Sequence, residues 1–254
     1  MRIGTYNVYG LRGYPAEVAA QQLGGPLDER AAAHFARVFN ALGCDALALQ
    51  EGVAHSQMQR IAALQGCGLA TLPSPLDWPG HLLSRYDIVE SRVFSHYAPD
   101  AEARPLTRAA GAVLLDVGPG ARLWVVVVHL FPGVGHAARR LQESRIIDAH
   151  VGVLLGDTPY VVVLGDFNAE VDEGCHDWLR ARGFVNAVQR ATGALIPTKG
   201  ARAVDHIYLS PALAPGLRAA AVVAGAGFVA PTDADARAWA HSDHLPVVVS
   251  LDWP

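Results

Sequence analysis

The residues of this chain that could do chemistry are polar side chains placed where apolar runs begin or end. They are Asn7, Glu51, His129, Asp166, Asn168, Asp205, Asp243 and His244. Glu51 and Asp243 offer hard carboxylate oxygens, amide oxygens belong to the same set, and no cluster of cysteines and histidines offers soft ligands. Hard oxygen ligands favour Mg²⁺ or Mn²⁺ over zinc. The set therefore predicts a magnesium or manganese site.

The other members of the set suit the hydrolysis of a phosphoester. A cation on a phosphoryl oxygen neutralises charge that builds up in the transition state. Asp166 would orient or deprotonate the attacking water, and Asn168 would fix the water or the phosphate. His129 and His244 can donate to phosphate oxygens, while Asp205 would hold one imidazole in a useful tautomer.

Each residue taken alone also has an ordinary interpretation. Asn7 and the Asp166-Phe167-Asn168 stretch are compatible with simple turns, and His129 with a core histidine whose ring is satisfied. Taken together, so many chance placements are a poor explanation. A module that only binds phosphates is a further interpretation, but it gives no reason for having both Asp166 and an Asp205–His244 pair.

The apolar runs beside these residues are typical of buried strands, which form continuous Val/Ile/Leu runs. Four runs precede a polar cluster and two follow one: 2–6, 45–49, 124–128 and 160–164, then 207–209 and 245–249. If the last two strands run antiparallel to the others, all the clusters reach the same rim of a sheet. Catalytic groups collect at such rims because loops begin there.

Helices and strands alternate along the chain. Amphipathic spacing predicts helices over 27–42, 57–64 and 134–155, with Gly43 ending the first. Further strands are expected at 82–84, 88–97, 111–117 and 222–224. This mixture indicates an α/β sandwich whose sheets are covered by helices, folded as one domain over residues 1–254. Segments 9–26 and 227–241 are long enough to be functional loops.

Composition limits the class of protein. Hydrophobic residues make up 51% of the chain and charged residues 17%, which suits a large core and excludes disorder. The net charge of −4 gives no overall positive field to attract a polyanion. The cysteines Cys44, Cys67 and Cys175 lack metal-ligand spacing, so we expect small buried hydrophobes in a reducing compartment.

No secretory leader is recognisable, and no apolar run approaches the roughly 20 residues that cross a bilayer. We therefore expect a soluble, cytoplasmic monomer, although a processed secreted form would have the same sequence.

The order of the motifs resembles the endonuclease/exonuclease/phosphatase superfamily, which includes pancreatic-type deoxyribonucleases, apurinic endonucleases, bacterial neutral sphingomyelinases, inositol polyphosphate 5-phosphatases and deadenylases. The matching stretches are Thr5-Tyr6-Asn7, Leu49-Gln50-Glu51, Leu83-Ser84-Arg85, Val128-His129-Leu130, Gly165-Asp166-Phe167-Asn168, Val204-Asp205-His206-Ile207 and Ser242-Asp243-His244-Leu245-Pro246. Each motif is weak alone, but the ordered set is specific and spans nearly the whole chain.

The resemblance implies a four-layer α/β sandwich, two stacked mixed β-sheets flanked by helices. It also implies residue roles at the matching positions. Glu51 would be the main metal ligand, helped by Asn7 and Asp243. Asp166 would position the nucleophilic water, with Asn168 facing the phosphate. His129 would contact the phosphate or assist the leaving group, and His244 would bind phosphate or act as acid/base, backed by Asp205.

Two stretches depart from the resemblance, Pro79-Gly80-His81 and residues 199–204. Because both are expected to edge the substrate pocket, we expect them to affect the substrate and not the metal or the water. The loop before Ser242, with Phe228 and Trp239, suits a lid over a small or lipidic headgroup, or equally a surface loop with Trp239 packed inward.

The substrate is the least determined part of the prediction. No basic run longer than Arg139-Arg140 occurs, which disfavours nucleic acid. We therefore expect a phosphodiesterase acting on a small or lipid-derived phosphoester, with a DNA or RNA nuclease as the alternative. A clustering in space of Arg12, Arg104, Arg108 and Arg202 would favour the nuclease.

Overall fold

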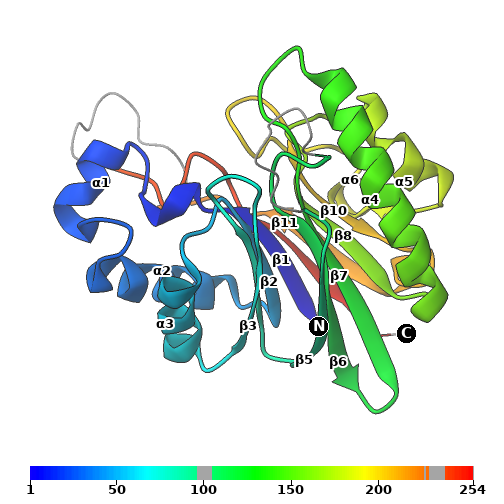
Figure 1. Ribbon diagram of the computed structural model, residues 1–254, viewed down its shortest axis with the longest axis horizontal. Helices are drawn as coiled ribbons and strands as arrows, with labels where there is room; N and C mark the ends of the chain where they lie inside the picture. The colour runs from blue at the N-terminus through cyan, green and yellow to red at the C-terminus, as the bar shows by residue number, and fades with distance from the viewer. Residues whose placement is uncertain (96–104, 226, 229–237, 254) are drawn as a thin grey trace.

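Two six-stranded sheets lie face to face with helices on their outer sides in the computed structural model, which describes residues 1–95, 105–225, 227–228 and 238–253 (Figure 1). One sheet consists, in order, of β11 (Leu217–Val222), β12 (Val247–Leu251), β1 (Arg2–Asn7), β2 (Ala46–Gln50), β4 (Gly80–Ser84) and β3 (Gly68–Leu72). The other consists of β5 (Asp87–Val93), β6 (Ala110–Gly118), β7 (Ala121–His129), β8 (Val161–Asp166), β10 (Asp205–Leu209) and β9 (Val185–Asn186). The predicted four-layer sandwich is confirmed.

The core between the sheets explains why the central strands are apolar runs. Side chains such as Ile3, Ala48 and Leu82 of the first sheet pack with Val125 and Leu164 of the second, all fully buried. Alternate residues of the same strands face outward and are covered by helices, so neither face of a central strand meets water. Burying one such Val or Leu side chain stabilises the fold by about 1.5–3 kcal/mol.

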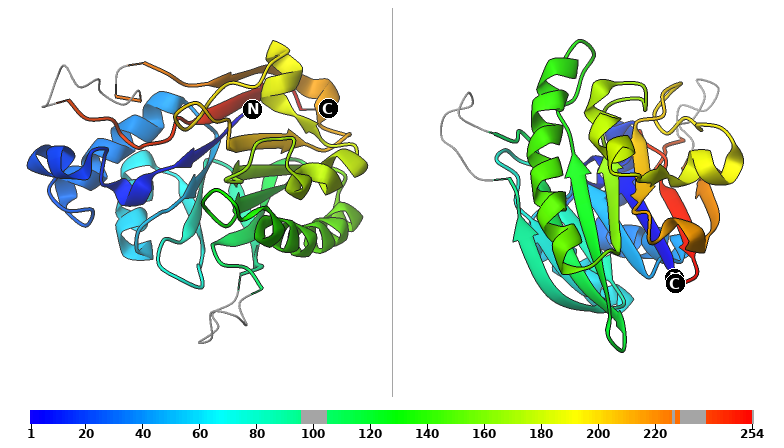
Figure 2. Two further views of the ribbon diagram at one scale, coloured as in Figure 1. Left: turned by 90° about the horizontal axis from the view of Figure 1, so that it is seen from above. Right: turned by 90° about the vertical axis from the view of Figure 1, so that its right-hand side faces the viewer.

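The helices cover the outer faces of the sheets. The helix α4 (Ala137–Asp157) lies along the outer face of the second sheet (Figure 2). Its Val151 and Leu154 belong to one buried cluster with Trp124 of β7. On the first sheet lie α2 (Glu29–Leu42) and α3 (His55–Gln65). The smaller elements are α1 (Ala16–Leu23), α5 (Asp177–Ala181), α6 (Ala187–Thr192) and the 3₁₀ turns η1 (Tyr9–Leu11), η2 (Gly174–His176) and η3 (Ala214–Gly216).

Strand direction decides where the polar clusters lie. In the first sheet β1 and β2 are parallel and β12 is antiparallel to β1. In the second sheet β7 and β8 are parallel and β10 is antiparallel to β8. The start of β10 and the approach to β12 therefore reach the same rim as the ends of β1, β2, β7 and β8. The last two strands of the motif set thus run antiparallel to their neighbours, as the sequence-based prediction of a shared rim required.

The predicted elements are present with shifted bounds. The strand expected at 88–97 is β5, and its last two predicted residues lie outside the described part of the chain. Segment 9–26 is not a plain loop, because it contains η1 and α1. Of segment 227–241, residues 229–237 are not described. Its described part is paired with segment 9–26, since Tyr14 and Ala240 exchange backbone hydrogen bonds of 2.8 and 2.7 Å.

All three cysteines are free thiols, with Cys175 buried and the other two half-buried. Within the described ranges, no helix is both long enough and apolar enough to pass through a bilayer.

Candidate active site

Asn7 connects the two sheets at the shared rim. It ends β1 and is fully buried. Its Nδ2 donates to Oε1 of Glu51 at 3.1 Å and to Oδ2 of Asp166 at 2.9 Å, while its Oδ1 accepts from the Tyr9 amide at 3.2 Å. In this arrangement the amide nitrogen of Asn7, not its oxygen, faces the carboxylates. Its role as a metal ligand remains a prediction that requires the oxygen to turn toward the cation.

Glu51 follows β2 in a left-handed backbone conformation, with φ of +51°. Its peptide oxygen accepts from the Gly10 amide at 2.8 Å. Its side chain is 18% exposed, and burial raises the pKa of the carboxyl, although the hydrogen bond from Asn7 acts in the opposite direction. A nearby cation would stabilise the ionised form of such a half-buried carboxylate.

The turn at Glu51 is supported by the first stretch that departs from the family resemblance. The Gly52 amide donates to the Pro79 oxygen at 2.8 Å, and Nε2 of His81 is 2.9 Å from the Val53 oxygen. Burial lowers the pKa of His81 to about 4, so its neutral ring donates to Val53. This departure therefore shapes the backbone beneath Glu51.

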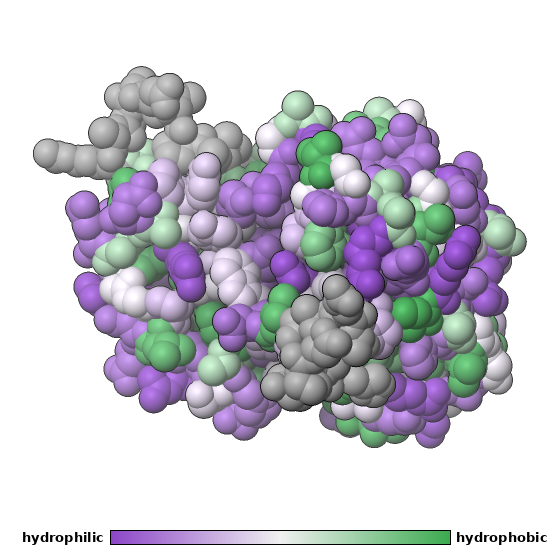
Figure 3. Space-filling model, turned by 45° about the horizontal axis from the view of Figure 1, so that its top comes forward, coloured by the Kyte–Doolittle hydropathy of each residue, from purple (hydrophilic) through white to green (hydrophobic). Residues whose placement is uncertain are grey.

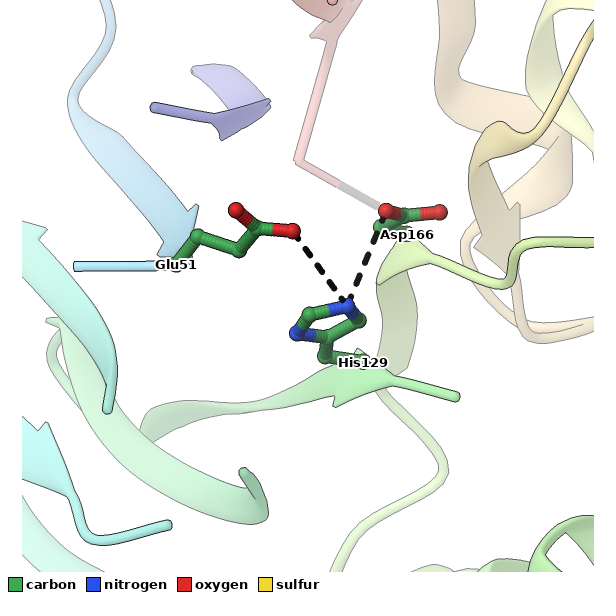
Figure 4. A group of neighbouring side chains, drawn as sticks. All are labelled: Glu51, His129 and Asp166. Atoms are coloured by element: carbon green, nitrogen blue, oxygen red, sulfur yellow. Dashed lines mark ion pairs between the residues drawn. The ribbon is translucent and has the colours of Figure 1, made fainter. Parts of the chain in front are cut away.

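His129 ends β7 between two carboxylates. Its Nε2 lies 3.9 Å from Oε1 of Glu51 and 3.8 Å from Oδ2 of Asp166 (Figure 4). Burial lowers the pKa of the ring well below its usual value, and neither ring nitrogen has a hydrogen-bond partner among the described residues. A buried polar ring without partners is costly. We infer that a ligand completes the hydrogen bonding of His129.

Asp166 ends β8 and faces His129. Its Oδ1 accepts from the Asn168 amide at 2.8 Å, so the Asx-type turn and the functional interpretation are both compatible with the structure. The side chain of Asn168 donates to the Leu130 oxygen at 3.0 Å. Burial, and then the charge of Asp205, raise the pKa of Asp166 to about 7. A carboxylate with a pKa near 7 is suited to accept a proton from water at neutral pH.

Asp205 and His244 form a buried pair. Asp205 lies opposite Asp166 in the β8–β10 register, and its Oδ2 accepts from Nδ1 of His244 at 2.8 Å. Burial alone would lower the pKa of His244, but the charges of Asp205 and Asp166 outweigh it and raise the pKa to about 9. The pair thus fixes the ring and leaves Nε2 facing Asp166, 3.8 Å away.

Lys199 is a site residue that sequence reasoning placed only at the edge of the substrate pocket. Its Nζ lies 2.8 Å from Oδ2 of Asp243 and 2.9 Å from Nε2 of His244. The second departure from the family resemblance therefore contacts both a predicted metal ligand and a predicted catalytic residue, contrary to our expectation. The only available signal was that Lys199 is the single lysine of the chain.

Only one proton fits between Lys199 and His244. Burial lowers the pKa of Lys199, but its hydrogen bond to Asp243 and the surrounding carboxylates raise it on balance above 10.5. When Nζ of Lys199 donates to Nε2 of His244 at 2.9 Å, the imidazole is neutral, with its one proton on Nδ1 facing Asp205. The charge of Lys199 itself acts to lower the pKa of His244, so this contact favours the neutral ring.

Ser242 ties the last loop to β1. Its hydroxyl donates to the Asn7 oxygen at 2.7 Å and accepts from the His244 amide at 3.2 Å. The hydroxyl thus sets the distance between Asn7 and the His244 segment. Sequence reasoning named Ser242 only as part of a motif.

The donor groups fit a divalent cation. Ligand atoms of Glu51, His129 and Asp166 lie within 4.8 Å of one another, and so do those of Asp166, Asp205 and His244. In the described part of the chain, Nε2 of His129 has no hydrogen-bond partner, and the pKa values of the Glu51 and Asp166 carboxyls are raised. Both features are expected of a site that binds a cation and a phosphate, because these ligands would supply the missing partner and the missing positive charge. All eight predicted residues belong to this contact network, and their individual roles remain predictions.

Comparison with known proteins agrees with a phosphoesterase site. The sequence profile of the endonuclease/exonuclease/phosphatase family matches residues 4–244. The chain belongs to this family. Enzymes of the family are phosphoesterases, phosphatases and nucleases among them, and generally use divalent metals. No curated protein sequence matches the chain closely enough to count as a relative.

Solved structures share the fold at low sequence identity. A mannosyl-6-phosphatase from Bacteroides thetaiotaomicron is 16% identical with a TM-score of 0.77, and the alignment covers 100% of both chains. The human nocturnin catalytic domain is 18% identical with a TM-score of 0.73, covering 99% of this chain and 93% of that one. A 3′ phosphatase from Neisseria, bound to a product DNA hairpin, is 18% identical with a TM-score of 0.68 over 100% of both chains. At such identities these similarities establish the fold.

Proposed function

We propose that this protein hydrolyses a small phosphoester with Mg²⁺ or Mn²⁺, by attack of an activated water, and that its preferred substrate is a diester. The observation that carries the proposal is Asp166, a buried carboxyl with a pKa of about 7 that contacts Asn7 and faces both histidines of the rim. A structural carboxylate would be paired with a cation or with more donors.

Glu51, Asp243 and the amide oxygen of Asn7 would hold the cation. When bound, the cation would supply neutralisation of the charge on a phosphoryl oxygen. Lys199 already lies against Asp243, so it adds a second positive charge on the same side of the rim.

The chain's own residues supply the proton transfers and the positioning. Asp166 accepts the proton of the attacking water. His129, neutral because burial lowers its pKa, donates one ring N–H to a phosphate oxygen. His244 is held by Asp205 and takes up its second proton from solvent when Lys199 moves onto the phosphate, so it can then donate that proton to the leaving group.

A Mg²⁺-dependent DNA or RNA nuclease is the second candidate, favoured by Arg12 and Arg108, which line two pockets that share Trp78. The other two arginines considered, Arg104 and Arg202, do not support the nuclease. Arg202 donates to the Asn168 oxygen and lies 3.9 Å from Glu170, and Arg104 is outside the described residues.

The deciding experiment compares bis(p-nitrophenyl) phosphate, p-nitrophenyl phosphate and plasmid DNA as substrates with Mg²⁺ or Mn²⁺, at about 100 mM salt so that weak electrostatic binding does not dominate. Turnover should vanish with EDTA and fall by about 10²–10⁴-fold in Asp166→Asn. Asp87→Asn serves as the matched control and should retain turnover, because this exposed aspartate begins β5 at the end of the sheet away from the rim.

The three substrates separate the proposals. Faster cleavage of the diester supports the proposed function, whereas metal-dependent nicking of plasmid with little diester activity supports the nuclease. Turnover that survives both EDTA and Asp166→Asn would refute metal-assisted hydrolysis at this site.

We further infer a monomeric, single-domain protein of a reducing compartment such as the cytoplasm, because all three cysteines are free. Size-exclusion chromatography with light scattering tests the first part.

A further inference from the structure

A pocket of about 430 Å³ opens directly beside the predicted catalytic residues. Glu51, His129, Tyr9, Trp78 and Arg108 line it, and Leu76, Asp77 and Pro132 complete the lining. Sites for small molecules have volumes of about 300–1,000 Å³. The pocket is therefore large enough for the part of a substrate that does not react.

Two aromatic residues of the pocket have unusual backbones. Tyr9 has a φ of +48° and Trp78 a φ of +76°. Bulky side chains rarely adopt this left-handed region, which costs roughly 1–2 kcal/mol per residue. Such strain persists where surrounding structure imposes it, and it gathers at binding sites.

The two rings pack against each other. Their centroids are 5.8 Å apart with an interplanar angle of 70°. The Tyr9 amide donates to Asn7, and the Arg12 guanidinium lies 5.4 Å from the centroid of the Trp78 ring. This edge-to-face pair forms an apolar wall next to the rim.

Arg108 supplies an unpaired charge to the same pocket. Among the described residues it makes no ion pair within 4 Å, and its one hydrogen bond goes to the Thr107 oxygen at 3.0 Å. The loop that carries it is anchored, because Glu143 accepts from both the amide and the hydroxyl of Thr107, at 2.9 and 2.5 Å, and from the Phe131 amide at 2.8 Å. The charges of Glu143 and Glu51 act on this half-buried guanidinium without forming an ion pair with it, so it can still hold an anionic ligand.

We propose that this pocket selects a phosphoester whose non-reacting part is a ring with a flat or apolar face, packed on Tyr9 and Trp78 while Arg108 holds the phosphate. The inference rests on the proposed function and narrows its substrate. The chemistry is shared by nucleotides, which present a base, and sugar phosphates, which present the face of a pyranose.

Other substrates fit the surface less well. Across the face in Figure 3, hydrophobic residues are scattered among hydrophilic ones instead of forming the broad apolar patch that a lipid surface would need. The chain's net charge of −4 disfavours docking a duplex over a long stretch. A small ring-bearing molecule needs only the pocket.

The test measures binding without turnover. Ligand-observed NMR in EDTA gives dissociation constants for adenosine 5′-monophosphate, glucose 6-phosphate and glycerol 3-phosphate, which carry the same phosphate on a base-bearing nucleoside, a sugar ring and an acyclic group. We expect at least one ring-bearing ligand to bind roughly five- to a hundredfold more tightly than glycerol 3-phosphate. The identity of that ligand tells a base from a sugar.

Variants separate the ring from the phosphate. Trp78→Asn keeps a residue that tolerates positive φ, so it removes the ring without adding backbone strain. It should abolish the preference for ring-bearing ligands and leave glycerol 3-phosphate unchanged, while Arg108→Met should weaken all three ligands. Trp253→Asn, a half-buried tryptophan packed on Tyr160, should change nothing.

Several results would overturn the inference: equal affinity for all three ligands, no binding of any of them, or a Trp78→Asn variant that weakens all equally. Because EDTA removes the cation, these outcomes do not depend on hydrolysis. Failure of the proposed function would appear instead as ring-selective binding without turnover when Mg²⁺ or Mn²⁺ is restored.

Discussion

Asp166 is the residue in which burial and function conflict most clearly. Its pKa of about 7 lies far above the 3.8 of an exposed aspartate, so the fold disfavours the ionised form. The resulting loss of stability is fully present above pH 7 and disappears as the pH falls toward 4. A site that keeps such a carboxyl exchanges stability for a base that works at neutral pH.

Asp166→Asn tests both sides of this exchange. Turnover should fall by about 10²–10⁴-fold, the usual contribution of a general base. In EDTA at pH 8 the melting temperature should stay within a few degrees of the wild type, because the lost hydrogen bond from Asn7 or Asn168 is offset by the removal of a buried charge. Calorimetry at pH 8 and pH 5 checks this, and a large stability loss at pH 8 would show that the carboxylate is structural.

On the proposed ligand set, Lys199 would compete with the cation for Asp243, because both would neutralise the same carboxylate. Lys199→Met should therefore raise the affinity for Mg²⁺ or Mn²⁺ while lowering kcat by about tenfold or more. Isothermal titration gives the first quantity and steady-state kinetics the second. Lys199→Arg should restore part of kcat because it restores the charge. Unchanged metal affinity in Lys199→Met would contradict the competition.

At the scale of elements, the contact between β7 and β8 places His129 beside Asp166. Gly165 makes it possible. Its φ is +142°, and a Cβ there would lie 1.9 Å from the Val128 backbone oxygen. Backbone atoms cannot move aside as a flexible side chain can, so the two strands approach only with glycine at this position.

Gly165→Ala should destabilise the protein by several kcal/mol, since it combines a backbone clash with an unfavourable φ. Gly156→Ala is the matched control. Gly156 lies in α4, a Cβ there would meet nothing within 4 Å, and alanine should stabilise by about 0.5–1 kcal/mol. Urea unfolding followed by circular dichroism measures both. Equal stability of the two variants would contradict the close approach of β7 to β8.

For the whole molecule, buried neutral histidines govern stability in acid. Burial, with smaller effects of nearby charges, lowers the pKa of His176 to about 3 and that of His81 to about 4. The unfolded chain binds protons at both positions below about pH 6.5. Stability contributed by these rings is therefore complete above pH 6.5 and is lost as the pH falls below it. Asp166 acts in the opposite direction over part of this range.

The urea midpoint in EDTA should therefore fall between pH 7.5 and pH 5. Each such histidine contributes about 2 kcal/mol to the decline at pH 5. The His176→Gln variant has no ring to protonate, so its free energy of unfolding should fall by about 2 kcal/mol less than that of the wild type. The His136→Gln variant, changed at an exposed position, should behave as the wild type. A His176→Gln variant with the full decline would show that other groups control acid unfolding.

Much of the architecture is local and was predictable. The runs that became β1, β2, β7 and β8 are apolar throughout because both faces of these strands are covered, and each polar cluster directly follows the run that positions it. Helix α2 ends at Gly43 as predicted, because a glycine there adopts φ of +63°. The short helix α1 was missed although its residues are mostly strong helix formers, because eight residues give too few turns for a clear amphipathic period.

Every contact between segments distant in the sequence required the tertiary structure. The pattern named Asp166 and Asn7, but their 2.9 Å hydrogen bond joins residues 159 positions apart. Lys199 against Asp243, Arg108 without a partner, and the Tyr9–Trp78 wall leave no periodic or motif signal, because a lone charge or ring has the same sequence whether it faces water or a site. Apolar patterning specifies which strands are buried, and only their packing specifies which side chains meet.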